Sequence, residues 1–204
     1  MGANKISFLV LCFLCWWSSA ACQSVLESYP VFPKTTEQRV KLITLAQSQV
    51  GVKELTGNND GKEVEMYLRS VGLKKGNPYC AAGVSWCHIQ LNIPNPESGW
   101  SPAWFNNNVV YRKGEPRTIP FKYRGGEVVG FYVPSKGRIG HVGLAKMETK
   151  LHVETIEFNT NGMGSSEGQG VHNLIRKKET IYVVSDFVGW KEFLEGVKAL
   201  KSKK

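Results

Sequence analysis

The chain has few cysteines for its length and no apolar segment of membrane-spanning length. It contains five cysteines in 204 residues. Three of them, Cys12, Cys15 and Cys22, fall within the first 22 residues, so that only Cys80 and Cys87 remain for the rest of the chain. The hydrophobic share of 42% and the charged share of 21% are typical of a soluble globular protein, which excludes both a disordered and a membrane-embedded chain.

Acidic residues are also in short supply. Seventeen Asp and Glu residues face 26 Lys and Arg residues, which gives a net charge of +9. A basic protein is suited to anionic polymers of the cell envelope or to lipid surfaces. Nucleic acid would be another such partner, but the chain shows no basic and aromatic interleaving and no nucleic-acid module. Internal repeats and low-complexity tracts are absent as well, and the length fits one domain.

The N-terminal segment "MGANKISFLVLCFLCWWSSAACQS" has the layout of a secretory signal peptide. One lysine precedes an apolar run from Ile6 to Trp17, which is too short to be a comfortable permanent anchor. We therefore predict a signal peptide over residues 1–21, a linker over 22–34, and export to the periplasm or cell envelope. Lipid attachment at Cys22 is a second possibility, although Ser19 stands where a large aliphatic residue is usual.

Helical patterns come first in the body of the chain, and strand patterns follow. Residues 35–51 read as an amphipathic helix with a capping box from Thr35 to Gln38 and an apolar stripe. Its stripe consists of Val40, Ile43, Ala46 and Val50. Further helices are expected over 61–72 and from Pro78 to about Gln90. β-rich runs then occupy 118–123, 127–133, 139–147, 151–158, 170–175 and 181–187. This order predicts an α+β fold with an antiparallel sheet in a single domain over 35–204.

The segment "NPYCAAGVSWC", residues 77–87, holds both cysteines of the body. In a helix, seven residues separate them by roughly 10 Å along one face, whereas a disulfide needs Cα atoms within about 7 Å. Cys80 and Cys87 therefore cannot bridge each other. Cys80 lies at the expected helix start, where free N–H groups and the helix dipole favour a thiolate. It is thus either a buried structural thiol or a nucleophile, and Cys87 is read as a buried structural thiol.

A nucleophilic cysteine needs a base, and the segment "GRIGHVGLAKM" places His141 at the start of an apolar strand behind a glycine turn. The base in turn needs an acceptor that orients it. The next strand supplies Glu157 and Asn159, which alternate with Phe158 and are expected on one face. Glu154 is expected on the opposite face. The order of cysteine, histidine and acceptor is the layout of a papain-like catalytic site.

With these residues in this order, the sequence resembles the CHAP family, the cysteine, histidine-dependent amidohydrolases and peptidases. The resemblance rests on "NPYCAAGVSWC", on "GHVG" some sixty residues later and on "E-F-N" in the next strand, and it spans about residues 38 to 190. It implies a papain-like fold related to the NlpC type, with N-terminal helices packed on an antiparallel sheet. It also implies an enzyme that cleaves a peptidoglycan amide bond, either in the peptides or between N-acetylmuramic acid and L-alanine.

Carried over by position, the resemblance makes Cys80 the nucleophile, His141 the general base, Glu157 its orienting carboxylate and Asn159 a supporting polar residue. Tyr79 stands where many members have an oxyanion-hole glutamine. Tyr79 and Trp86 are candidate substrate-binding residues. The segment "GNNDG" matches a calcium loop poorly, so we expect no metal and no cofactor.

Peptidoglycan or its peptide fragments is the expected partner, and we expect a monomer. Two alternatives remain open. One is a non-catalytic module that binds the envelope, and the other is a cysteine hydrolase that acts on a protein amide.

Overall fold

The structure is a computed structural model that describes residues 33–116, 121–165 and 167–189. The predicted signal peptide, Cys22 and most of the predicted linker lie outside the described residues. The chain divides into two compact units, Met1–Thr36 and Glu37–Lys204. The second unit holds every residue of the predicted catalytic site.

The described residues form three α-helices, three short 3₁₀ helices and six strands. The α-helices are α2 (Pro33–Gln47), α3 (Lys62–Ser70) and α4 (Cys80–Gln90), and the 3₁₀ helices are η1 (Ser101–Phe105), η2 (Pro134–Lys136) and η3 (Lys178–Thr180). The strands are β1 (Val109–Arg112), β2 (Val128–Val133), β3 (Arg138–Glu148), β4 (His152–Thr160), β5 (Gly170–Lys177) and β6 (Val183–Ser185). The predicted α+β class with an antiparallel sheet is confirmed.

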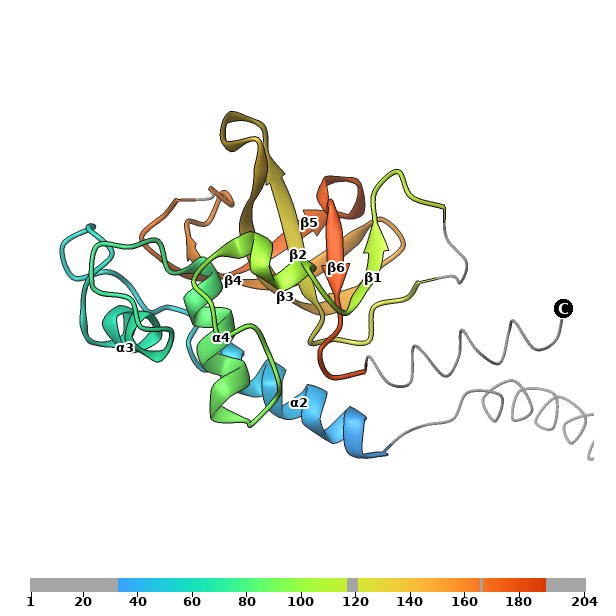
Figure 1. The fold of residues 1–204 in the computed structure, drawn as a ribbon, viewed down its shortest axis with the longest axis horizontal. Helices are drawn as coiled ribbons and strands as arrows, with labels where there is room; N and C mark the ends of the chain where they lie inside the picture. Colours follow the sequence, from blue (N-terminus) through green and yellow to red (C-terminus); the bar gives the residue numbers. More distant parts are fainter. Residues whose placement is uncertain (1–32, 117–120, 166, 190–204) are drawn as a thin grey trace, which may run out of the picture. The chain divides into compact units, whose positions relative to one another are not determined.

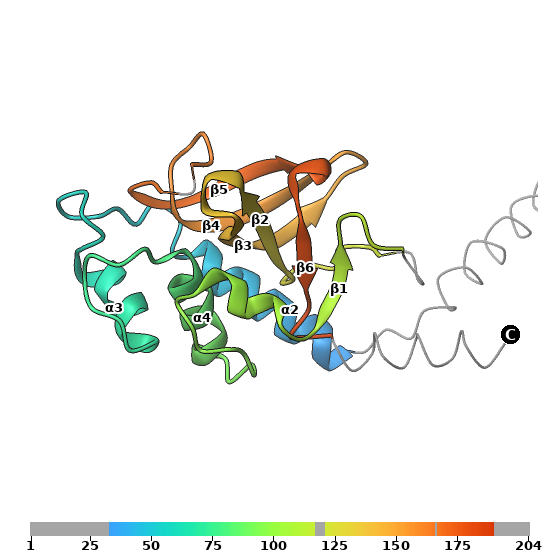
Figure 2. The same ribbon diagram turned by 45° about the horizontal axis from the view of Figure 1, so that its top comes forward.

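All six strands belong to one antiparallel sheet in the order β1-β6-β2-β3-β4-β5. Strands β2 to β5 follow one another in the chain and in the sheet, whereas β6 returns to lie between β1 and β2 (Figure 1). The strands β3 and β4, which carry the predicted base and its acceptor, are therefore direct neighbours, with β5 at the edge beyond β4 (Figure 2).

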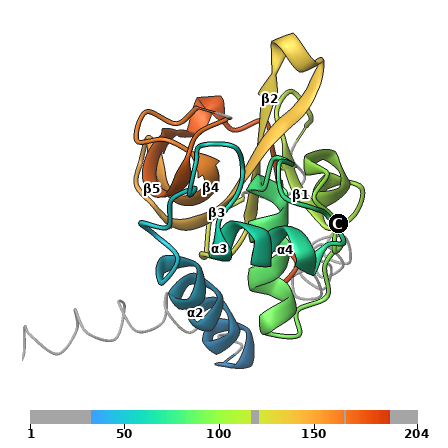
Figure 3. The same ribbon diagram turned by 90° about the vertical axis from the view of Figure 1, so that its left-hand side faces the viewer.

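Helix α4 packs on β3 and β4, and α3 packs on α4. Figure 3 shows both helices on the same side of the sheet. The main hydrophobic core fills this interface, and fully buried side chains from both layers meet there, among them Leu68, Val84, Leu144, Ile156 and Phe158. Gly83 allows the close contact, because a Cβ atom there would lie 2.2 Å from the ring of Phe158. The first turn of helix α4, which begins at Cys80, therefore packs closely against β4.

A second apolar cluster covers the opposite face of the sheet. It is built from alternate residues of the same strands, with aromatic side chains packed against it, and it contains Val129, Phe131, Ala145, Val153, Ile181 and Val184. Because both faces are covered, the central strands are apolar over most of their length rather than alternating. Polar side chains at the middle of β3 and β4 are consequently buried.

A buried group of three charges ties α2 to the sheet. The Arg39 guanidinium donates a hydrogen bond to Asp186 at 2.6 Å and lies 3.5 Å from Glu127. Glu127 also accepts the N–H groups of Arg124 and Gly125. Burial raises the pKa of Glu127 to about 7, although the positive charge of Arg39 acts to lower it. The positive charge of a single buried arginine therefore stabilises two buried carboxylates.

Several local predictions need correction. Helix α2 begins at Pro33 and ends at Gln47, so Thr35 is not its N-cap and the capping box is wrong. Of the predicted apolar stripe, Ala46 is fully buried and Ile43 and Val50 pack against the core, but the side chain of Val40 is 60% exposed. The fully buried Leu42 takes its place, so the stripe is wrong at that one position. Helix α4 begins at Cys80 rather than near Pro78, with Tyr79 as the residue before it.

Two predictions about the strands also fail. In the expected strand over 118–123, residues 121–123 are not in a strand, and 118–120 lie outside the described residues. Strand β1 was missed because four residues after an asparagine-rich turn give too short a pattern to recognise.

Candidate active site

The cysteine of the site occupies the first position of α4. The first hydrogen bond at this end of the helix runs from the Gly83 N–H to the Tyr79 carbonyl, at 2.9 Å, so the N–H groups of residues 80–82 precede the helical ladder. One of them, the N–H of Ala81, lies against the Cys80 sulfur and favours its thiolate form. Only 3% of Cys80 is exposed. The helix start therefore supplies local positive potential to a buried thiol.

The predicted base and its acceptor lie on adjacent strands. His141 Nε2 and Glu157 Oε2 are 2.8 Å apart. Glu157 pairs in register with Gly143, two residues beyond His141, so the contact is a diagonal one across the strand pair. Gly143 leaves room for it, because a Cβ atom there would lie 2.5 Å from Glu157 Cγ. The missing side chain lets the carboxylate bend towards the imidazole.

Glu157 is fully buried and has two further partners that sequence reasoning missed. Arg176 on β5 donates two hydrogen bonds, from Nε to Oε1 at 2.8 Å and from Nη2 to Oε2 at 2.5 Å. Thr155 donates from Oγ1 to Oε1 at 2.6 Å. Burial alone would raise the pKa of Glu157, but the hydrogen bonds from Arg176 and His141 lower it to about 2. The carboxylate is therefore ionised and fixed in position.

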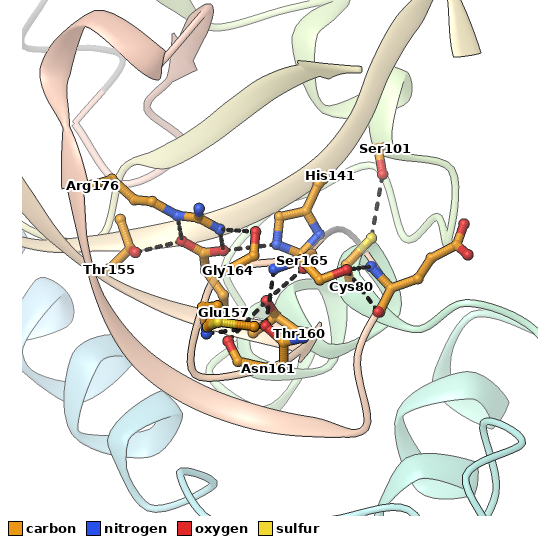
Figure 4. Close-up of polar contacts among 12 residues, drawn as sticks. Cys80, Ser101, His141, Thr155, Glu157, Thr160, Asn161, Gly164, Ser165 and Arg176 are labelled. Atoms are coloured by element: carbon orange, nitrogen blue, oxygen red, sulfur yellow. Dashed lines mark hydrogen bonds and ion pairs between the residues drawn. The ribbon is translucent and has the colours of Figure 1, made fainter. Parts of the chain in front are cut away.

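Figure 4 shows His141 between Cys80 and Glu157. With Nε2 committed to Glu157, the nitrogen left for the cysteine is Nδ1. This atom is buried and makes no hydrogen bond of normal geometry within the described part of the chain. It is the nitrogen that could exchange a proton with the thiol.

The interaction with His141 changes the charge state of the thiol. Burial would raise the pKa of Cys80, but its contact with His141 and the charge of the imidazolium lower it below the ordinary value. Burial would likewise lower the pKa of His141, and its contacts with Cys80 and Glu157 raise it to about 9. The arrangement thus favours a thiolate beside an imidazolium. Together with Glu157 and Arg176 it forms a group of four charges with no net charge.

Ser101 is a further neighbour of the cysteine that sequence reasoning missed. It opens η1, is 4% exposed, and places its Oγ 3.4 Å from the Cys80 sulfur (Figure 4). This contact also lowers the pKa of Cys80. A serine in a loop after "NIPNPESGW" gives no signal in the sequence, since only the folded chain brings it to the helix start.

Asn159 lies at an irregularity of strand β4. The pairing of β4 with β5 shifts register between Glu157 and Thr160, and Asn159 has a φ of +55°. Regular strand alternation therefore does not extend through this position, and the shared face of Glu157 and Asn159 stays a prediction. The residue is 2% exposed, and its Nδ2 has no hydrogen-bond partner among the described residues, His141 included.

The two candidate substrate-binding residues lie in the core. Tyr79 is fully buried and stacks on Tyr67, and Trp86, 8% exposed, also packs against that ring. Their assignment to substrate binding stays a prediction, and their burial in the core does not support it. Cys87 is free and fully buried, and burial raises the pKa of its thiol. The predicted absence of a Cys80–Cys87 disulfide is confirmed, because both thiols are free.

Two further properties concern the whole of the described structure. Across residues 33–116, 121–165 and 167–189, every helix is too short or too polar to span a lipid bilayer. The same residues contain no group of three or more His, Cys, Asp or Glu side chains placed to hold a metal ion.

Comparisons of the chain with models of protein families, with curated proteins and with solved structures gave no match. The likeness to the CHAP family thus rests on the sequence motifs alone. Function has to be inferred from those motifs and from the geometry of Cys80, His141 and Glu157.

Proposed function

We propose that the chain is an exported cysteine hydrolase that cleaves an amide bond of peptidoglycan, with a papain-like fold of the CHAP type. One observation carries the proposal: His141 lies between the Cys80 thiol at a helix start and the buried Glu157 carboxylate (Figure 4). Nucleophile, base and orienting acceptor are the three parts that this chemistry needs. The motifs that resemble the CHAP family and the basic composition favour the anionic cell wall as the substrate.

In the first half of the reaction the Cys80 thiolate attacks the carbonyl carbon of the amide. The carbonyl electrons move to oxygen, where free N–H groups at the start of α4 stabilise the negative charge. The Ser101 hydroxyl, 3.4 Å from the sulfur, is a candidate second donor. His141 then gives its Nδ1 proton to the leaving nitrogen. The C–N bond breaks, the amine departs, and a thioester remains on Cys80.

In the second half water attacks the thioester. His141, now neutral, takes a proton from the water while the C–S bond breaks. A carboxylic acid leaves, and the thiolate–imidazolium pair is restored. Glu157 keeps its Nε2 contact in both halves, so it orients the ring and stabilises the charged form without taking the proton.

Digestion of purified peptidoglycan tests the proposal directly. The protein and its Cys80→Ala variant are incubated with walls of several chemotypes, and the soluble products are identified by mass spectrometry. We expect fragments with new amino and carboxyl ends from the wild type only, and these ends identify the bond. Equal release by both proteins would remove Cys80 as the nucleophile. No release by either would favour a binding module or an effector that acts on proteins.

A further inference from the structure

A cavity of about 330 Å³ opens beside the candidate site. Its walls are the loop after α2, the turn before α4 and the loop between β4 and β5. They include Glu54, Asn59, Pro78, Asn159 and Gln169. Pro78 precedes Cys80 by two residues, which limits their Cα atoms to about 7 Å apart. When a peptide substrate is bound at Cys80, an adjacent residue of the peptide can therefore reach the cavity.

The cavity walls are fixed to one another by main-chain hydrogen bonds. The Glu54 N–H donates to the Gln169 carbonyl at 3.0 Å, and the Gly76 N–H donates to the Asn59 carbonyl, also at 3.0 Å. On the other side, the Gly168 N–H donates to the Asn159 carbonyl at 3.1 Å. The cavity is thus formed before any ligand arrives, as small-molecule sites commonly are.

Glu54 brings an unpaired negative charge to this cavity. Its carboxylate accepts the Asn59 N–H at 2.9 Å, but no basic side chain in the described structure forms an ion pair with it. The nearby Tyr79 hydroxyl stays neutral, because burial and the Glu54 charge raise its pKa. The other acidic lining residue, Glu167, is already bonded to Lys136 at 2.6 Å. The Glu54 charge is therefore available to a cationic group of a ligand.

Asn159 gives independent support for a ligand. It lines the same cavity, it is 2% exposed, and its Nδ2 has no hydrogen-bond partner within the described residues. A buried donor without a partner is unfavourable, because it has lost its bonds to water. An acceptor on a ligand, such as a peptide carbonyl, would satisfy the amide.

We propose that this cavity is a subsite that recognises a protonated amine of the substrate peptide, with Glu54 pairing the ammonium and Asn159 donating to a nearby carbonyl. The subsite rests on the proposed function, because it takes the ligand to be a peptide held at Cys80. The amine belongs either to the N-terminus of a stem peptide or to the side chain of its diamino acid. Both sources present the same ammonium.

Calorimetric titration of the Cys80→Ala protein separates the sources. The probe is the stem peptide L-Ala-γ-D-Glu-L-Lys-D-Ala in three forms: unmodified, acetylated on the α-amine, and acetylated on the lysine side chain. We expect the unmodified form to bind and one acetylated form to bind at least ~10-fold more weakly, since a hydrogen bond to a charged group is worth about that much or more. The acetylated peptide that binds more weakly identifies which of the two amines is recognised. Failure of all three forms to bind would overturn the subsite.

Adding Glu54→Gln to this protein removes the charge but keeps an oxygen for the Asn59 N–H. We expect it to weaken binding of the unmodified peptide at least ~10-fold and to abolish the difference between the forms. Glu179→Gln removes a negative charge at an exposed position of η3. It is expected to change neither the affinity for the unmodified peptide nor the difference between the peptide forms. Thermal melts establish that both variants are folded. Unchanged affinity in the Glu54→Gln protein would overturn the subsite.

The two proposals can fail separately. If walls are cleaved through Cys80 but Glu54→Gln binds all forms as before, the subsite is overturned and the function stands. If the peptides bind with the expected preferences but walls are not cleaved, the function is overturned and the binding site stands.

Discussion

Arg176 holds both carboxylate oxygens of Glu157 by a pair of hydrogen bonds, at 2.8 and 2.5 Å. The pair matters because Glu157 is fully buried and could not stay ionised in neutral surroundings. By keeping the carboxylate charged, Arg176 on β5 acts on the imidazole of His141 on β3 without touching it.

Replacing Arg176 by methionine should therefore reduce both stability and activity. The variant leaves a buried carboxylate with one charged partner fewer, and we expect it to lose about 3–5 kcal/mol of unfolding free energy. Arg69→Met, at a position that is 63% exposed and bridged to Glu65 on the helix surface, should lose less than about 1 kcal/mol. Urea denaturation compares the two. A loss for Arg176→Met no greater than that of the control would contradict the role given to the pair.

Glu157→Gln should lower the alkaline limit of activity. The pKa of His141 is raised to about 9 partly by Glu157, so the imidazolium is present below that pH and is lost as pH rises through it. Without the carboxylate the limit should move down towards the ordinary histidine value near 6.5, and kcat/KM should fall roughly 100-fold. The control is Glu154→Gln, which removes a half-buried carboxylate of the same strand. The pH dependence of kcat/KM is the measurement, and an unshifted alkaline limb would refute the assignment.

The two cysteines should differ sharply in reactivity. The pKa of Cys80 is lowered by His141 and that of Cys87 is raised by burial, and only the thiolate reacts with iodoacetamide. Of these two cysteines, we expect only Cys80 to be alkylated at about pH 6, and its alkylation to be slowed at least ~10-fold by His141→Ala. Peptide mapping by mass spectrometry locates the label. Labelling of Cys87 in the folded protein, or equal rates in both proteins, would contradict the prediction.

Gly83→Ala should damage the site through packing. The new methyl group would lie 2.2 Å from the Phe158 ring, and because that ring is fully buried it has no room to move. Overpacking of this kind costs about 1–3 kcal/mol, and a shift of α4 would displace Cys80 from His141. Gly162→Ala, where a Cβ atom meets nothing within 4 Å, is the matched control. Thermal melts and wall digestion together should show loss for the first variant only.

Glu127 should make stability depend on pH in a recognisable way. Its pKa is about 7 in the folded chain, against an ordinary value of 4.5, so the folded state binds more protons between these values. Its contribution to stability therefore falls as pH rises from about 4.5 to 7, by about 3 kcal/mol. Glu127→Gln cannot titrate, so the stability of wild type minus variant should decline across that window. Urea denaturation at several pH values checks this, and a constant difference would exclude the predicted titration.

The helices and central strands could be predicted because their residue patterns are long and regular. The three helices and strands β2 to β6 lie where the periodicity placed them. His141 and Glu157 could be selected as a candidate base and acceptor because they lie on strands that follow one another in the chain, and the structure brings them into contact. Val40 was misplaced because the helix buries the adjacent Arg39, which pairs with Asp186 and Glu127, and a buried ion pair leaves no trace in an apolar pattern.

The remainder of the site could not be found in this way, for physical reasons. Arg176 is one of 26 basic residues, and nothing in its neighbourhood distinguishes it before the strands pair. Ser101 reaches Cys80 only through tertiary folding. The register shift after Glu157 interrupts the regular strand at Asn159, and a bulge of that kind has no signature in an alternating pattern.

The buried Glu157–Arg176 pair also constrains how related sequences can diverge. Under the proposed function, a lineage could replace Cys80 in one step and lose activity at little cost to folding, since a small side chain would remain at the helix start. Loss of Glu157 or of Arg176 alone would instead leave a lone charge in the interior. We therefore expect the two positions to change together in any set of homologues, and to outlast the nucleophile wherever catalysis has been abandoned.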